Sequence, residues 1–194
     1  MCTNFENFAN PVLVLDLFKS SGINISKEKK NDVKQDSIRP TNKILTILKQ
    51  NDEYRITYTN WGIKFNNKPP LILNSRIETI TEKPFWKNLF NKKRALLPMT
   101  AFFEWKPSGK IKTRYKIFLP DEDLFFVPAL YVEQNNELFT SLVTVPNNEF
   151  MKNIHNRMPA IIRKNDALKM IEAEMDDALE MCKPYNGKMK AAPA

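Results

Sequence analysis

Three consecutive apolar segments constrain the fold of this chain most strongly. They read TRYKIFL (113–119), LFFVPALYV (124–132) and ELFTSLVTV (137–145), and they are rich in the β-branched and aromatic side chains that favour strands. Between them lie DED and EQNN, which are typical of turns. Since strands joined by such short connections pair antiparallel, the segments predict a mainly antiparallel sheet.

Further strand segments precede this run. ILTIL (44–48) and YRITYTNWGI (54–63) have the same enrichment, and RALLP (94–98) and AFFEW (101–105) predict strand pieces around a bend at Pro98–Thr100. The polar stretch SKEKKNDVKQDS (26–37) indicates an exposed loop. With so many strands close together in the sequence, we expect a barrel-like β core.

Helices are fewer. Residues 78–90 predict a short helix interrupted by Pro84, and NNEFMKNIH (147–155) predicts a short helix or turn capped by Asn147 or Asn148. The last element is an amphipathic helix after Asn165 or Asp166, with apolar residues at helical spacing: Leu168, Ile171, Met175, Leu179 and Cys182. Cys182 is therefore expected to be buried. Strands with a few flanking helices give an α+β fold class.

Length and composition favour a single domain over residues 1–194. Hydrophobic residues make up 42% of the 194, which is enough for a substantial core. The two cysteines, far apart, form neither a disulfide framework nor a metal-ligand pattern, so no metal or cofactor is expected and a reducing compartment is favoured. PVLVLDLF is too short to span a membrane. We expect a cytoplasmic monomer without a signal peptide.

The charge points to a polyanionic partner. The net charge is +8, and residues 84–116 hold nine basic side chains and one acidic side chain, whereas residues 166–180 hold six acidic and one basic. One surface is therefore expected to be positive and another negative, and a positive surface attracts nucleic acid. A solvated lysine-rich exterior is the alternative explanation.

Cys2 directly follows the initiator methionine, where an ordinary core residue is not expected. If Met1 is removed, Cys2 carries an α-amine and a thiol on adjacent carbons. An aldehyde can condense with such an amine, and the thiol can then close a five-membered ring. The other cysteine has no such chemistry.

Four further stretches carry polar or aromatic residues suited to a site. They are WGIKF with Trp61, NSRIET with Asn74 and Arg76, AFFEWK with Glu104 and Trp105, and IHNRMPAII with His155 and Arg157. Each has a structural explanation as well. Glu104 can point outward from a half-buried strand, His155 can be an ordinary polar residue, the arginines can form surface ion pairs, and Trp61 can belong to the core.

Taken together and in this order, the stretches resemble the SOS-response-associated peptidase (SRAP) family, whose members shield abasic sites in DNA. The resemblance runs from Cys2 to about Ile162. It implies loss of Met1, binding of single-stranded DNA that carries an abasic site, and a thiazolidine crosslink between Cys2 and the ring-opened sugar. It further implies location on the nucleoid when DNA is bound.

The resemblance also assigns roles. It places the nucleophile at Cys2, a substrate-positioning amide at Asn74, the catalytic acid at Glu104 and a catalytic histidine at His155. Phosphate contacts are carried over to two arginines, Arg76 and Arg157. Elementary chemistry agrees with these roles, because an α-amine with a pKa of about 7.7–8.0 is partly neutral at neutral pH and a carboxyl in an apolar wall can stay protonated.

Single-strand binding needs aromatic platforms as well as a basic groove, and Trp61, Phe102 and Trp105 are candidates. The chain departs from the family at its start, which reads MCTN where members read MCGR, so Thr3 and Asn4 replace a glycine and an arginine and one phosphate contact is expected to be lost. Two other functions stay open at this point. One is a thiol peptidase that uses Cys2, with autocatalytic removal of Met1; the other is a non-catalytic DNA-binding module.

Overall fold

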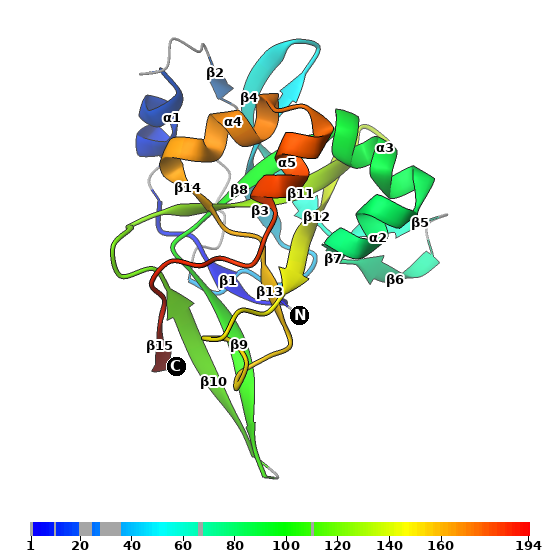
Figure 1. The fold of residues 1–194 in the computed structure, drawn as a ribbon. Helices are drawn as coiled ribbons and strands as arrows, with labels where there is room; N and C mark the ends of the chain where they lie inside the picture. The colour runs from blue at the N-terminus through cyan, green and yellow to red at the C-terminus, as the bar shows by residue number, and fades with distance from the viewer. Residues whose placement is uncertain (1, 10, 20–24, 28–35, 66–67, 110) are drawn as a thin grey trace.

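Five strands close into a barrel. The computed structural model describes residues 2–9, 11–19, 25–27, 36–65, 68–109 and 111–194. The barrel strands are β3 (Lys43–Gln50), β4 (Glu53–Trp61), β8 (Arg94–Met99), β11 (Phe125–Gln134) and β12 (Glu137–Pro146). They pair antiparallel in the order β12-β11-β8-β3-β4, and β4 returns to β12 in a parallel pairing that closes the barrel (Figure 1). The predicted mainly antiparallel, barrel-like core is confirmed.

The barrel strands bury mainly apolar side chains, together with a few hydroxyl groups that pair with one another. Buried Thr59 contacts Thr46 at 2.8 Å and Thr140 at 3.0 Å, oxygen to oxygen, so three hydroxyls on adjacent strands satisfy one another. Buried polar groups are tolerated when they are hydrogen-bonded in this way. Gly62, with a φ of +119°, turns the chain sharply after β4, and this is why YRITYTNWGI is divided between two strands.

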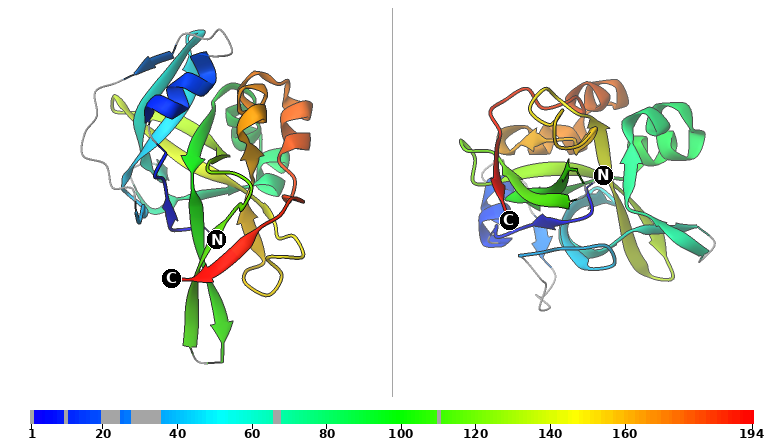
Figure 2. Two further views of the ribbon diagram at one scale, coloured as in Figure 1. Left: turned by 90° about the vertical axis from the view of Figure 1, so that its left-hand side faces the viewer. Right: turned by 90° about the horizontal axis from the view of Figure 1, so that it is seen from below.

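A second sheet stands against one end of the barrel. Its strands are β1 (Phe5–Glu6), β9 (Ala101–Ser108), β10 (Ile111–Phe118) and β15 (Lys190–Pro193), in the order β1-β9-β10-β15. The β9–β10 hairpin projects from the body of the molecule (Figures 1 and 2). Both ends of the chain are edge strands of this sheet, so the C-terminal MKAAPA segment contributes to the fold.

Short strands extend the barrel wall. β2 (Ile25–Lys27) pairs parallel with β4, and β14 (Ile162–Arg163) pairs with β11. β12 is flanked by β7 (Asn74–Arg76), which runs parallel to it, and by β13 (Arg157–Pro159), which runs antiparallel. A separate pair is formed by β5 (Ile63–Phe65) and β6 (Lys68–Ile72). β12 thereby brings NSR and RMP, which begin 83 residues apart in the sequence, to the same part of the wall.

Helices cover the outside. They are α1 (Pro11–Lys19), α2 (Ile77–Glu82), α3 (Pro84–Lys92), the single 3₁₀ turn η1 (Lys164–Asp166), α4 (Ala167–Glu172) and α5 (Met175–Met181). As predicted, Pro84 divides a helical segment, and it opens α3 at a position where its missing N–H costs nothing. No helix in the described part of the chain is both long enough and apolar enough to span a membrane.

The prediction of one continuous C-terminal helix is wrong. The chain forms α4 and α5 with a break at Ala173 and Glu174, although both helices turn apolar residues to the same core. Arg94 binds the chain just before this break. Its buried guanidinium donates to the carbonyls of Met170 and Ile171, both at 3.1 Å. These carbonyls are capped by a side chain instead of by the N–H groups of a continuing helix.

Two loop predictions have different outcomes. Residues 147–155 form turns, and the Asn148 side-chain oxygen accepts a hydrogen bond from the Met151 N–H at 2.9 Å, as expected of a cap. Of the predicted polar loop 26–37, Ser26 and Lys27 belong to β2, and residues 28–35 lie outside the described residues.

Candidate active site

Cys2 is drawn into the interior by strand pairing. The Phe103 N–H donates to the Asn4 carbonyl at 2.9 Å, and β1 continues antiparallel along β9. Residues before β1 therefore run beside Glu104. The Cys2 side chain is fully buried, with its sulfur 3.7 Å from the Asn4 carbonyl oxygen. Burial, and next the nearby charge of Glu104, raise the pKa of the Cys2 thiol well above its usual range, so the sulfur is held as a neutral thiol.

The side-chain amide of Asn74 binds the backbone of Cys2. Its amide nitrogen donates to the Cys2 carbonyl at 3.0 Å. The side-chain oxygen of Asn74 is buried and accepts no hydrogen bond from the described part of the chain. Asn74 begins β7, whose parallel pairing with β12 fixes its backbone opposite Leu142. The amide thus positions Cys2 and leaves an acceptor beside it.

Glu104 is a buried carboxyl close to the Cys2 thiol and to His155. Its side chain belongs to β9 and is 3% exposed. Burial raises the pKa of Glu104, and the charge of nearby His155 opposes this rise without cancelling it. A carboxyl with a raised pKa holds its proton to higher pH than an exposed one, which suits a proton donor.

The imidazole ring of His155 is held by the backbone of Arg157. The Nδ1 atom of His155 lies 3.0 Å from the backbone nitrogen of Arg157 and 3.2 Å from its carbonyl oxygen. The turn before β13 holds the ring in this orientation. Cys2, Asn74, Glu104 and His155 thus form one chain of neighbours, although they come from four separate segments.

The two arginines predicted to contact phosphates differ in their surroundings. Arg76 is exposed at the start of α2. The Arg157 side chain is only 12% exposed and donates to the Glu78 carboxylate at 2.6 Å and to the Thr144 carbonyl at 2.7 Å. The pKa of Glu78 is lowered, mainly by its hydrogen bond from Arg157. Arg157 therefore joins α2 to β12 and β13, which leaves it little capacity for a phosphate.

The structure contradicts two of the predicted stacking platforms. Trp61 is 1% exposed and donates its indole N–H to the Leu73 carbonyl at 3.0 Å, and Phe102 is completely buried. Both rings are core residues because β4 and β9 turn these positions inward. Trp105 is partly exposed and stays a candidate.

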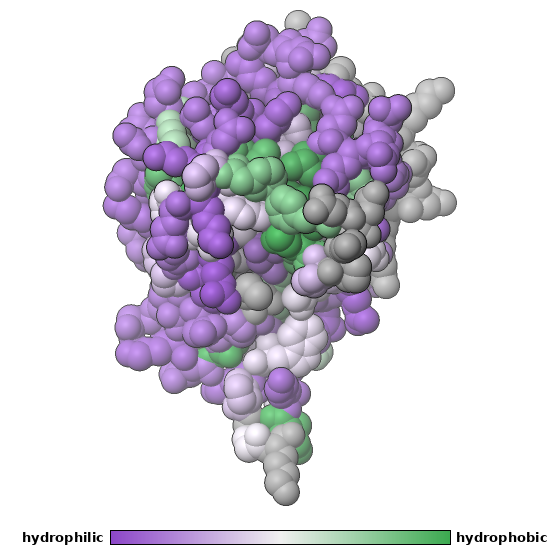
Figure 3. Space-filling model, turned by 90° about the vertical axis from the view of Figure 1, so that its right-hand side faces the viewer, coloured by the Kyte–Doolittle hydropathy of each residue, from purple (hydrophilic) through white to green (hydrophobic). Residues whose placement is uncertain are grey.

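The prediction from sequence missed a pair of exposed aromatic residues. Phe65 and Phe85 are exposed, and their rings meet edge to face with centroids 5.0 Å apart. Figure 3 views the molecule from the side of α2, α3 and the β5–β6 pair and shows apolar surface within a mainly hydrophilic face. The signal in the sequence is weak, because Phe65 follows Lys64 and Phe85 follows Pro84, each in a short segment.

Asn4 is structural, not an exposed substitute for an arginine. It is 1% exposed, and its amide nitrogen donates to the Ser37 hydroxyl at 2.9 Å. Its side-chain oxygen accepts a hydrogen bond from Arg114 Nη2 at 2.7 Å. Position 4 therefore links the N-terminal segment to β10.

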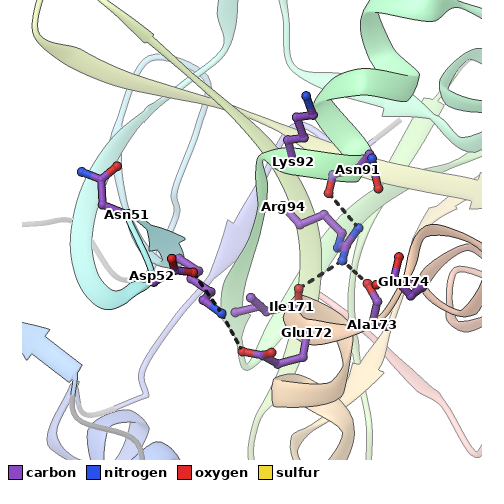
Figure 4. Close-up of a pocket in the computed structure, with 10 residues that line it drawn as sticks. Asn51, Asp52, Asn91, Lys92, Arg94, Ile171, Glu172, Ala173 and Glu174 are labelled. Carbon is purple, nitrogen blue, oxygen red and sulfur yellow. Dashed lines mark hydrogen bonds and ion pairs between the residues drawn. The ribbon is translucent and has the colours of Figure 1, made fainter.

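A polar pocket of about 410 Å³ lies elsewhere, between the β3–β4 turn, α3 and the α4–α5 break. Its wall contains Arg94, whose guanidinium is bound to backbone carbonyls, and the ion pair between Lys49 and Glu172 at 3.3 Å (Figure 4). The charged groups of Arg94, Lys49 and Glu172 in this pocket thus already have partners within the protein. Among the described residues, no cluster of three or more His, Cys, Asp or Glu side chains could hold a metal ion.

Known proteins share both sequence and fold with this chain. An abasic site processing protein of Bacillus subtilis, YoqW, is 31% identical over 166 residues, which cover 77% of this chain and 73% of that protein. The abasic site processing protein YedK of Escherichia coli is 27% identical and covers 72% and 65%. A crystal structure from Bordetella bronchiseptica has the same fold, with a TM-score of 0.81 and 15% identity, over 100% of this chain and 99% of that chain. The sequence model of the SOS response associated peptidase (SRAP) family matches residues 1–194, so the chain belongs to that family.

Proposed function

We propose that this protein binds abasic sites in single-stranded DNA and crosslinks to them through Cys2, which shields the lesion. One observation carries the proposal: the Cys2 backbone is held by Asn74 at 3.0 Å while a buried carboxyl, Glu104, lies beside it with His155 as the next neighbour. Membership of the SRAP family and the names of the relatives, abasic site processing proteins, support it.

The reaction begins with hydrolysis of the Met1–Cys2 peptide bond, which consumes one water molecule and frees the α-amine. The amine nitrogen then attacks the aldehyde carbon of the ring-opened sugar. A proton reaches the aldehyde oxygen, water leaves, and a Schiff base remains. The thiol sulfur adds to the imine carbon, its proton passes to nitrogen, and a thiazolidine ring closes without oxidation or reduction.

Each residue has a task in this sequence. Glu104, with its raised pKa, donates a proton to the departing oxygen and accepts one again in the reverse direction. His155, whose charge acts on Glu104, serves as a second proton-transfer group. The Asn74 side-chain oxygen accepts a hydrogen bond from the α-amine and directs the nitrogen lone pair at the sugar.

The state of the thiol favours crosslinking over general peptidase activity. A thiol peptidase needs a thiolate, and burial raises the pKa of Cys2 so that the thiolate is disfavoured. Addition to an imine needs no preformed thiolate, because the imine nitrogen takes up the proton. In this proposal the peptidase activity in the family name is restricted to removal of Met1.

Denaturing electrophoresis of a labelled abasic oligonucleotide tests the proposal. The wild-type protein should give a heat-stable adduct, and its intact mass should lack Met1. Cys2→Ser keeps the amine and should give only a Schiff base that borohydride traps. An N-terminal extension before Cys2 should abolish both products, although the thiol is intact.

The matched control is Cys182→Ser, which removes the other buried thiol and should crosslink like the wild type. A heat-stable adduct from the extended protein would exclude the thiazolidine mechanism. Equal retention of DNA by all variants, with no covalent product from any, would favour a non-catalytic binding module.

A further inference from the structure

A guanidinium group is held in a fixed orientation close to Cys2. Arg114 lies on β10 opposite Trp105. The centre of its guanidinium lies 3.8 Å from the centroid of the Phe103 ring, and its Nη2 atom donates to the Asn4 side-chain oxygen at 2.7 Å. Stacking fixes the plane of the group and the hydrogen bond fixes its direction within that plane, so the cation is preorganised.

Asn4 connects this cation to the nucleophile. Its side chain accepts the hydrogen bond from Arg114, and its backbone carbonyl oxygen lies 3.7 Å from the Cys2 sulfur. Asn4 is itself buried and tied to Ser37. The distance between the guanidinium and the thiol is therefore set by a single rigid residue.

The charge of Arg114 is not balanced by a carboxylate. Within the described residues no acidic side chain pairs with Arg114, and Nη2 is the one guanidinium nitrogen that has an acceptor. Its neighbours differ: on the same strand Lys116 pairs with Glu6 at 2.7 Å, and Arg157 pairs with Glu78 at 2.6 Å. A partly exposed, unbalanced guanidinium with unused donors is suited to an anion such as phosphate.

We propose that Arg114 binds a backbone phosphate next to the lesion whose sugar is joined to Cys2. The inference rests on the proposed function. The phosphates that flank a sugar are only a few covalent bonds from its aldehyde carbon, so a sugar bonded to Cys2 must place one of them within reach of the residues around Asn4. Arg114 is the fixed cation at that place, and Phe103 and Asn4 are its positioning residues.

Salt-dependent binding of an undamaged single-stranded oligonucleotide, measured by fluorescence anisotropy, tests the inference. Arg114→Ala should weaken binding and lower the slope of log K against log salt concentration by about 0.7, the value for one phosphate contact on a single strand. Arg114→Lys should keep most of the slope. Asn4→Asp should lower the slope as Arg114→Ala does, because the new carboxylate would pair with Arg114 in place of the phosphate.

Lys112→Ala is the matched control, since Lys112 is an exposed cation on the same strand, farther toward the hairpin tip. Its slope should stay closer to wild type than that of Arg114→Ala, and thermal unfolding should confirm that all variants are folded. An unchanged slope in Arg114→Ala would overturn the inference, and so would a normal slope in Asn4→Asp. If either result is found but the wild-type protein crosslinks to abasic DNA, only the inference about Arg114 fails and the proposed function stands. If the wild-type protein does not crosslink to abasic DNA, the proposed function is refuted.

Discussion

Glu104→Gln should slow crosslinking and should also stabilise the protein relative to wild type as the pH rises. The amide cannot exchange protons, and general acid–base groups contribute about 10²–10⁴-fold. At about 1.4 kcal/mol for each factor of ten, this is roughly 3–5 kcal/mol of activation free energy. The side chain is 3% exposed, so glutamine of nearly equal volume should be accommodated without a cavity.

The effect on stability follows from the raised pKa of Glu104. Between the pKa of the unfolded chain and the higher pKa of the folded protein, the folded state binds the additional proton. Stability contributed by Glu104 is therefore present at low pH and is lost as the pH rises through the folded pKa. Each unit of separation corresponds to about 1.4 kcal/mol, and in a chain of this length each kcal/mol changes the melting temperature by about 2–4 °C.

The assay is thermal unfolding of wild type and Glu104→Gln from pH 5 to 8, together with single-turnover crosslinking over the same range. The difference in melting temperature should grow in favour of the variant as the pH rises. Glu78→Gln is the matched control: because Arg157 lowers the pKa of Glu78 from 4.5, its contribution is complete over this range, and the difference between this variant and wild type should not change with pH. If the melting temperatures of Glu104→Gln and wild type change in parallel with pH, and their crosslinking rates are equal, Glu104 is not the proton carrier.

Three further predictions concern binding and stability. Arg76→Ala should lower the salt slope of single-strand binding by about 0.7, and a slope equal to that of wild type would show that Arg76 contacts no phosphate. Arg157→Ala should mainly lower the melting temperature, because Arg157 pairs with Glu78. Arg94→Ala should destabilise the fold in urea unfolding by about 1–3 kcal/mol for each buried carbonyl of Phe90 and α4 that it leaves unpaired, and a total loss below about 1 kcal/mol would contradict this role. Trp61→Phe should cost about 1–3 kcal/mol through the lost bond to Leu73 and leave the salt slope unchanged, and a reduced DNA affinity at equal folded fraction would restore Trp61 as a stacking platform.

Local patterns were sufficient for most of the strands. β-branched and aromatic runs separated by turn residues are satisfied by pairing with the next segment, and so β3, β4, β8, β9, β10, β11 and β12 lie where the sequence predicts them. Pro84 and Asn148 act through local backbone geometry and were equally readable. The proposal that Cys2 acts as an aminothiol also rests on its position in the sequence.

Long-range contacts decided what the local patterns left open. A spacing of 3–4 residues cannot distinguish one helix from two that face the same core, and Arg94, more than seventy residues away, caps the first of the two. Exposure of an aromatic ring depends on which face of a strand meets the core, so Trp61 and Phe102 were buried where stacking platforms were expected. Asn4 and Arg114 are hydrogen-bonded to each other although 110 residues separate them, so they meet only in the folded chain. Side-chain chemistry is therefore encoded locally, whereas burial, pairing and the charge that remains unbalanced depend on strand register between distant segments.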